Sequence, residues 1–443
     1  MPVKAELRKR VCKEIDRYCD EIIAVCESAL SHPEPGFKEK RTARLVEDKF
    51  IELGIPYRAG LAVTGIKAIL KGKQTRPMIA VIGELDSLVI PDHPHADPVT
   101  GAAHACGHNA QVAMLIGVAT ALSRSGVMSW LDGSVALIAA PAEEYIQIEY
   151  RQSLRKQGII EYLGGKAELI RLGEFDDIDM AMMTHTANLP EGKKLLMGGT
   201  SNGTIAKQVQ YLGKASHAGG SPHQGINALN AATIAMAAIN TQRETFKDAD
   251  TVRVHPIITK GGEAVNIVPA DVRMETFVRG KTLDAIKDAD RKVDRALRAG
   301  ALAVGAKVKI NTLPGYLPMQ NNELLQEVYR QNALRLLGKD EIIPAGTHGT
   351  GSTDMGDVAH IMPAVHPMIG GVSGTSHGND YLVCDHRLAV ITPAKIMAMS
   401  VIDLLADGAT KAKEILEKCK PAMTKAEYIT LMNSFLKEEE WQG

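Results

Sequence analysis

The chain has 443 residues, too many for one small domain, and its length predicts roughly two or three structural units. Its 51 Lys and Arg residues nearly balance 52 Asp and Glu residues, and the formal net charge of −1 supplies no field that would hold nucleic acid or anionic lipid. Aromatic residues make up only 4% of the chain, too few for a base-stacking surface. Nucleic acid and membranes are therefore not expected as partners.

The N-terminal residues 1–30 alternate charged and apolar side chains and contain no apolar stretch of signal-peptide length. We expect no apolar span of about 20 residues further along and a cytoplasmic location. The six cysteines include no C-x-x-C pair and are too dilute for a disulfide scaffold. Cys12, Cys19 and Cys26 follow a helical apolar pattern and are expected on a buried helix face, whereas Cys106 lies among histidines.

The first part of the chain alternates helical and strand patterns. Helices are predicted over 38–53 and 109–123, and strands over 62–70, 77–85, 134–140 and 179–184. Strands this uniformly apolar, separated by helices, are typical of a parallel sheet covered on both faces. We therefore predict an α/β domain.

Between residues 204 and 312 the predicted order becomes strand, helix, strand, strand, helix, strand. The strands are 205–212, 251–259, 270–278 and 307–311, and the helices are 226–242 and 282–304. This βαββαβ order is the split ferredoxin-like unit. Because the unit is complete in itself, we predict that 204–312 is a domain inserted into a first domain made of 1–203 and 313–443. In the latter part of the first domain, helices are predicted over 323–337 and near 394–406.

Candidate chemistry begins at residues 83–86, where a predicted strand ends, and at 104–109, where the next helix begins. In an open α/β sheet, ligands bind beyond the carboxyl ends of the strands. Cys106 and His108 are two residues apart, a spacing that converges in an irregular turn, and a thiolate with an imidazole suits a divalent transition metal. A buried thiol beside a capping histidine remains the alternative.

Two adjacent carboxylates, Glu143 and Glu144, follow the apolar strand 134–140. Burying them is costly unless they are paired or bind a metal, and neighbours in an extended segment point oppositely. One could therefore bind a metal while the other faces a substrate, although an exposed acidic turn is also compatible with the pattern. His185 follows another strand, where a lone histidine is more often structural.

Other patterns carry less information. The glycine-rich loops 351–356 and 376–380 prove no binding by themselves. Residues 199–203 match G-x-S-x-G, but a strand pattern follows where a nucleophile elbow needs a helix, which argues against a serine hydrolase. The chain contains neither a Walker A sequence nor H-E-x-x-H.

In their order along the chain, these pieces resemble the dinuclear metallopeptidases and amidohydrolases that include carboxypeptidase G, hippurate hydrolase, indoleacetyl-amino-acid hydrolases and aminobenzoyl-glutamate hydrolase. The resemblance is to the cysteine-ligand branch and covers nearly the whole chain, with motifs at 32–37, 84–86, 106–108, 143–144, 214–219, 261–269, 279, 352–356 and 377. It implies a mostly parallel catalytic domain of the zinc-exopeptidase type, with the inserted domain acting as a lid and dimerisation domain.

The resemblance also implies a metal site. It would hold two divalent ions per subunit, with Mn and Zn as the expected metals. Asp86 would not bind a metal itself but would orient one of the ligands. The five metal ligands would be Cys106, His108, Glu144, His185 and His377.

For catalysis, the resemblance implies that Glu143 is the general base that takes a proton from metal-bound water. His217 would stabilise the tetrahedral oxyanion, and Asn266 with Arg279 would grip a substrate carboxylate. A homodimer through the inserted domain is implied as well, with His217 as a candidate to act in the partner's site.

The chain departs from the commoner family pattern at several places. Asn109 follows the C-G-H motif where the cysteine-containing branch usually has Asp. The segment 145–164, which carries Arg151, Arg155 and Lys156, is longer than usual and could extend the pocket or decorate the surface. In 377–381, His-Gly-Asn precedes the acidic-aromatic pair where relatives often have His-Thr or His-Ser.

The leading hypothesis is a metal-dependent hydrolase of the amide C–N bond in a small N-acyl or N-aroyl amino acid, or a dipeptide-like substrate, with a free carboxylate. One alternative is hydrolytic removal of an amine from another small carboxylated compound at the same site. The alternative from another class is a non-catalytic binding subunit that keeps the fold. Metal content separates the enzyme from the binding subunit.

Overall fold

A computed structural model describes residues 3–443, which fall into two compact units. The first unit contains the chain up to residue 200 together with 320–347 and 357–425. The second contains 201–319, 348–356 and 426–443. Two short segments, 348–356 and 426–443, thus lie in the second unit although the sequence prediction placed them in the catalytic domain. Each unit is described by itself below.

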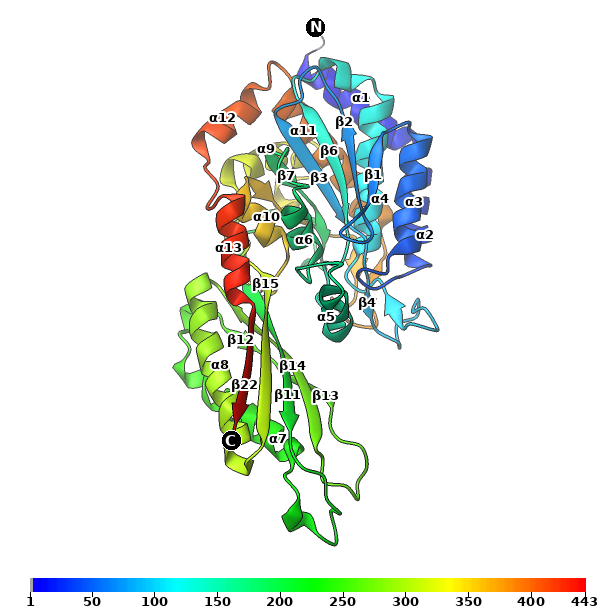
Figure 1. The fold of residues 1–443 in the computed structure, drawn as a ribbon. Helices are drawn as coiled ribbons and strands as arrows, with labels where there is room; N and C mark the ends of the chain where they lie inside the picture. Colours follow the sequence, from blue (N-terminus) through cyan, green and yellow to red (C-terminus); the bar gives the residue numbers. More distant parts are fainter. Residues whose placement is uncertain (1–2) are drawn as a thin grey trace. The chain divides into compact units, whose positions relative to one another are not determined.

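The first unit is built on a six-stranded sheet, which Figure 1 shows with β2, β6, β3 and β7 side by side. The pairs β6–β3, β3–β7 and β7–β18 are parallel, while β1–β2 and β2–β6 are antiparallel. Every residue of β3 and β6 is buried, which explains their uniformly apolar sequences. The mostly parallel α/β prediction is confirmed. In sheet order the strands are β1 (Tyr57–Leu61), β2 (Gly65–Leu70), β6 (Ser134–Ala140), β3 (Met78–Glu84), β7 (Met180–Met182) and β18 (Ala364–Val365).

Helix α4 (His108–Arg124) is the central helix of this unit and is buried from His108 to Leu122. It packs on β3, and α1 (Lys4–Arg17), α2 (Cys19–Leu30) and α11 (Thr392–Leu405) pack against it. A helix enclosed in this way has no polar face, as its sequence shows. The N-terminal helical pattern is divided in two at Tyr18, and Cys19 and Cys26 are buried while Cys12 is partly buried.

One helical stretch corrects an expectation from the sequence. Among the described residues, Arg387–Leu405 spans 19 residues and is long and apolar enough to cross a membrane, although no such span was predicted. Its apolar stretch is 78% buried inside the protein. It contributes Ile396, Val401 and Leu404 to the core of the first unit, which is the role of a core helix in a globular unit.

The remaining elements of the first unit are short. The long excursion after β6 forms two helices, α5 (Ile148–Lys156) and α6 (Gly165–Leu172), and a small four-stranded sheet has the order β16-β9-β19-β8. The other elements that begin in this unit are α3 (Lys40–Glu52), β4 (Leu88–Val89), β5 (Ala102–Ala103), β8 (His185–Thr186), β9 (Leu195–Leu196), β10 (Thr200–Ser201), α9 (Glu323–Ala333), β16 (Ile342–Ile343), β19 (Met368–Ile369), β20 (Val372–Ser373), β21 (Leu382–Val383), α12 (Thr410–Lys418) and α13 (Lys425–Phe435).

The second unit has the predicted βαββαβ order. Its antiparallel sheet runs β12-β14-β11-β15-β22, with β13 also paired to β14, and α7 and α8 pack together against it. Buried residues alternate with partly exposed ones along β14, as expected for a sheet with one covered face. Its elements are β11 (Gly203–Leu212), α7 (Ala228–Thr241), β12 (Arg253–Val254), β13 (Ile257–Lys260), β14 (Asp271–Gly280), α8 (Leu283–Val304), β15 (Lys307–Tyr316), β17 (His348–Gly349), α10 (Met355–Ile361, which continues into the first unit) and β22 (Lys437–Gln442).

Two features of this unit differ from the prediction. The predicted strand 251–259 is divided into β12 and β13 at His255 and Pro256, because proline has no N–H to donate to a ladder. The second difference is β22, which pairs with β15 from Lys307–Gln442 to Thr312–Lys437. Its sequence, KEEEWQ, is mostly charged and carries no strand pattern, so the sequence analysis missed it.

Candidate metal centre

Three neighbouring parallel strands deliver acidic and imidazole side chains to one edge of the sheet. In the register, Glu84 at the end of β3 pairs with Ala140 at the end of β6, and β7 lies on the other side of β3. Asp86, Glu143 and His185 follow these three strands. The site thus forms at the carboxyl ends of the parallel strands, as the sequence predicted.

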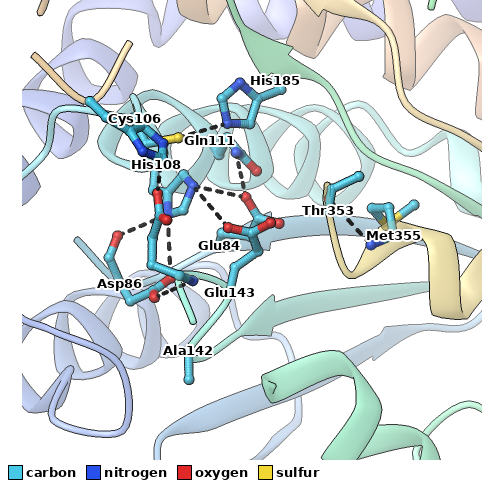
Figure 2. Close-up of polar contacts among 12 residues, drawn as sticks. Glu84, Asp86, Cys106, His108, Gln111, Ala142, Glu143, His185, Thr353 and Met355 are labelled. Atoms are coloured by element: carbon cyan, nitrogen blue, oxygen red, sulfur yellow. Dashed lines mark hydrogen bonds and ion pairs between the residues drawn. The ribbon is translucent and has the colours of Figure 1, made fainter. Parts of the chain in front are cut away.

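The turn before α4 brings Cys106 and His108 to the same edge. Gly107 between them has φ +83°, and a Cβ there would lie 2.1 Å from Oγ1 of Thr186, so glycine is required for both its conformation and its lack of a side chain. This close approach places the turn beside His185. The Sγ atom of Cys106 lies 3.3 Å from Nε2 of His185 (Figure 2).

Asp86 orients two of the predicted ligands. Nδ1 of His108 lies 2.9 Å from the backbone carbonyl oxygen of Asp86, so it donates its proton there and leaves Nε2 for the site. Oδ2 of the Asp86 carboxylate accepts the N–H of Glu144 at 2.9 Å. Asp86 itself is fully buried. These contacts place Asp86 beside two predicted ligands, and its role in orienting them stays a prediction.

Glu144 and His377 meet on the other side of Cys106. Oε1 of Glu144 lies 3.4 Å from Nε2 of His377, and within residues 3–443 this buried oxygen has no hydrogen-bond partner. His377 has φ +65°, a conformation that costs energy for a non-glycine residue, and its N–H donates to the carbonyl of Ala105 at 2.9 Å. Its side chain is 53% exposed, so the site is open to solvent here.

The predicted ligands make up two of the three donor groups among the described residues that could hold a metal ion. In each group the donor atoms lie within 4.8 Å of one another, and Cys106 belongs to both. Two ligands of one tetrahedral ion are roughly 3.5 Å apart when each bond is about 2.0 to 2.3 Å, close to the 3.3 and 3.4 Å separations above. The groups are Cys106 with His108 and His185, and Cys106 with Glu144 and His377.

The pKa shifts of His185 and Cys106 fit a metal site. Burial, together with the neighbouring His108, lowers the pKa of His185 to about 4, so the imidazole is in the neutral form that binds metals. Burial and the nearby Glu144 raise the pKa of the Cys106 thiol well above its usual range. A thiolate in this place therefore needs a bound cation to stabilise it. With the unpartnered Glu144 oxygen, these properties fit a divalent metal.

The third donor group consists of His108, Glu84 and Glu143. Nε2 of His108 is 3.2 Å from Oε2 of Glu84 and 3.9 Å from Oε2 of Glu143 (Figure 2). Glu84 is fully buried and is bound by Lys166 and by Nε2 of Gln111 at 2.7 Å. Burial alone would raise the pKa of Glu84, but the charges of Lys166 and His108 outweigh it and hold that pKa below its ordinary value.

The sequence analysis quoted Glu84 in a motif without giving it a role, and it missed Lys166. The motif 83–86 could have indicated Glu84, because residues 84 and 86 lie two apart at a strand end. Lys166 lies 82 residues beyond Glu84 and has no local signal. Asn109 is the other correction to the sequence picture: its amide donates to the carbonyl oxygen and Sγ of Cys26 in α2 and so serves packing.

The remaining predicted residues lie in the second unit. Nδ1 of His217 accepts the N–H groups of Gly219 and Gly220 at 3.2 and 2.9 Å, so the ring carries its proton on Nε2, and the residue is exposed. The chain at His217 forms a β-bridge to Ile267, and the N–H of Ala218 donates to the carbonyl of Asn266 at 2.9 Å. His217 and Asn266 are therefore brought to adjacent loops.

Arg279 lies in β14 opposite Thr204 and Arg253. Its guanidinium carbon lies 5.1 Å from the ring centroid of Phe277, two residues earlier on the same face of the strand. Arg279 is half-buried. Its role as a carboxylate-binding residue stays a prediction.

The chain was compared with known families and proteins. Residues 80–392 match the model of peptidase family M20/M25/M40. The chain is 28% identical to a Xaa-Arg dipeptidase of Mus musculus over 90% of this chain and 89% of that protein. It is 26% identical to the IAA-amino acid hydrolase ILR1-like 2 of Arabidopsis thaliana over 79% of this chain and 77% of that protein.

Among solved structures, the YXEP protein of Bacillus subtilis, described as a dinuclear metal binding peptidase from the M20 family, superposes with a TM-score of 0.64. The identity is 21%, over 88% of this chain and 99% of that one, and this likeness concerns the fold. The family match covers more than half of the chain and includes the strands and loops that supply the metal donors of the first unit. The protein is therefore a metal-binding hydrolase of C–N bonds and belongs to peptidase family M20/M25/M40.

Proposed function

We propose that this protein hydrolyses the amide bond between an acyl, aryl-acyl or aminoacyl group and an amino acid whose carboxylate is free. The observation that carries the proposal is the pair of metal-donor groups that share Cys106, with the carboxylate of Glu143 beside His108. When bound, two divalent ions would lower the pKa of water from about 15.7 to about 7 and polarise the scissile carbonyl.

Glu143 is assigned the proton transfer. Its Oε2 accepts a proton from the attacking water, the water oxygen adds to the carbonyl carbon, and the same proton passes to the leaving nitrogen as the C–N bond breaks. The products are a carboxylic acid and an amine, so no further reactant is needed. The 3.9 Å distance between Glu143 and His108 keeps the base next to the metal donors.

The second unit supplies the groups assigned to the substrate. The Nε2–H tautomer of His217 leaves a donor for the oxyanion, and its exposure leaves that donor accessible. Asn266, on the loop adjacent to His217, and Arg279 are assigned to the substrate carboxylate. The names of the dipeptidase and of the IAA-amino acid hydrolase support a substrate that ends in an amino acid.

The Glu143→Gln variant tests this assignment. It keeps the shape and removes the base, so we expect unchanged metal content and a fall in kcat of about 10³-fold or more. Glu149→Gln, an exposed carboxylate in α5, is the matched control and should keep kcat. Full amide hydrolysis by Glu143→Gln would overturn the proposal.

A substrate panel separates the reaction classes. N-acyl amino acids, dipeptides, aminobenzoyl-glutamate and amino-aromatic acids would be compared on enzyme reconstituted with Mn or Zn. We expect turnover of the amides. Release of ammonia from the amino-aromatic acids alone would identify the deamination alternative, and bound metal without any turnover would identify a binding subunit.

We also propose that the protein is a homodimer joined through its second unit. The support is apolar exposure near the edge strand β13: the side chains of Ile257, Val265 and Ile267 are 60%, 102% and 41% exposed. Analytical ultracentrifugation of the wild type and Ile257→Lys tests the proposal. A monomeric wild type would contradict it.

A further inference from the structure

Arg151 in α5 is a fully buried cation in the segment after the two glutamates. Within residues 3–443 it forms no ion pair. A buried charge without a counter-charge is costly and persists only where its hydrogen bonds are needed. The acceptors of Arg151 therefore indicate what it does.

The guanidinium binds the backbone on both sides of Glu143. Nη1 donates to the carbonyl of Ala142 at 3.1 Å and to that of Leu163 at 2.6 Å, and Nη2 donates to the carbonyl of Glu144. Two of these acceptors flank the predicted base, and one of them belongs to a predicted metal ligand. The planar fork of arginine fixes several acceptors at once, which lysine cannot do.

This backbone needs such support because Ala142 has φ +52°, a left-handed conformation that alanine disfavours. Its N–H donates to Oε1 of Glu39 at 2.8 Å, and its carbonyl also accepts the N–H of Gly165 at 3.2 Å. The strained residue immediately precedes Glu143 and sets the direction in which the two carboxylates leave the strand.

The surroundings hold the guanidinium in place. Its carbon lies 5.2 Å from the ring centroid of Phe37 and 5.8 Å from that of Tyr145. A Cβ on Gly36 would lie 2.3 Å from Nη2 of Arg151 and 2.9 Å from the Cα of Ala142, so only glycine fits beside these two residues. Gly36 and Phe37 belong to the motif 32–37, to which the sequence analysis gave no role.

We propose that Arg151 is a positioning residue for the reaction: through the carbonyls of Ala142 and Glu144 it aims Glu143 at the substrate and Glu144 at the metal. This inference rests on the proposed function of Glu143. It gives Arg151, within the segment 145–164, a supporting role at the site and removes it from both the pocket and the surface roles that the sequence left open.

The test compares Arg151→Lys with Arg155→Lys, one turn later in the same helix, where the side chain pairs with Glu161 at the protein surface. Metal content, Tm, kcat and KM would be measured for each metal-loaded protein. We expect Arg151→Lys to lose about 10- to 100-fold in kcat with KM within about twofold. Arg155→Lys should keep both constants.

A second variant keeps the guanidinium of Arg151 and disturbs the packing around it. Gly36→Ala pushes a methyl group against Nη2 of Arg151 and the backbone of Ala142, so it should also lower kcat. In Arg151→Ala, added guanidinium should restore part of the lost kcat, an effect not expected with the Arg155→Ala control.

A loss of Tm in Arg151→Lys with kcat unchanged per metal-loaded molecule would overturn the inference and leave Arg151 a purely structural residue. If Glu143→Gln stays active, the proposed function fails first. If Glu143→Gln is inactive while Arg151→Lys keeps its kcat, only the positioning role fails. If Arg151→Lys is insoluble, the kinetics of Gly36→Ala decide instead. A lower kcat with KM unchanged supports the positioning role, and an unchanged kcat overturns it.

Discussion

The two units place their functional side chains in opposite environments. In the first, Cys106, His108 and Glu144 are buried and fixed by neighbours such as Asp86 and Gly107. In the second, His217 and Asn266 are exposed on loops. Metal donors must be held before the metal arrives, whereas groups that bind a substrate must be reachable by it. Changes to the metal donors of the first unit should therefore affect metal content, and changes to His217 and Asn266 in the second should not.

The largest effect is expected for Cys106→Ser, because Cys106 belongs to both donor groups. The hydroxyl is a poor substitute for a thiolate, so metal should be lost and kcat should fall by on the order of 10³-fold or more. Elemental analysis and steady-state kinetics measure both. Cys384→Ser is the control, since that cysteine is free and exposed. A Cys106→Ser variant with its full metal content would contradict the role of Cys106 as a metal ligand.

His217→Ala should leave the metal content unchanged and lower kcat/KM by about 10²- to 10³-fold, the usual loss for one oxyanion donor. The exposed His223, in the same loop region, gives the matched control His223→Ala. Loss of metal from His217→Ala would mean that the division of roles between the units is wrong.

Arg279→Lys should raise KM about 10- to 100-fold for substrates with a free carboxylate, because lysine cannot form the bidentate pair. The same substrates with an amidated carboxylate already lack that pair and should change little. Competition kinetics on matched acid and amide substrates give the ratio. Equal effects on the acid and amide substrates would mean that Arg279 does not bind the substrate carboxylate.

Glu39→Gln should have the smallest effect on activity and a measurable effect on stability. Burial, helped by the charge of Asp86, raises the pKa of Glu39 from 4.5 to about 7, so its stabilising contribution is fully present below the lower value and is lost as pH rises through the upper one. Glutamine keeps an acceptor for Ala142 and a partner for Thr64 and does not titrate.

Relative to the variant, the wild type should therefore lose about 2 kcal/mol of unfolding free energy between about pH 5 and about pH 7. Denaturant unfolding at matched metal concentrations measures this difference. Parallel pH profiles of the two proteins would show that Glu39 is already ionised in the fold.

Patterns of neighbouring residues predicted the strand bounds, the edge of the sheet that carries the site, and the order of elements in the second unit. The strand 134–140 has the predicted bounds because all of its residues are buried, and the carboxyl-end rule located Asp86, Glu143 and His185 at one edge. The βαββαβ order of the second unit follows from six amphipathic or apolar segments in sequence, which the structure retains.

Contacts between distant residues could not be predicted in this way. Lys166 pairs with Glu84 from another element of the fold. Arg151 donates hydrogen bonds to backbone carbonyls, and such acceptors have no sequence signature. The charged β22 forms because the edge of β15 offers hydrogen bonds and because Lys307 and Arg298 pair with its glutamates. Each of these depends on the folded chain bringing two segments together.

The added strand β22 also limits how copies of this protein can assemble. It covers the outer edge of β15, and Gly443 donates its N–H to the carbonyl of Ala306 at 3.0 Å. The terminal strands of this sheet are then β22 at one end and β12 with β13 at the other. The outer edge of the sheet at this end is β22 itself, whose sequence KEEEWQ is mostly charged, and charged edge strands resist pairing with another copy, so this end is a poor site for filament growth.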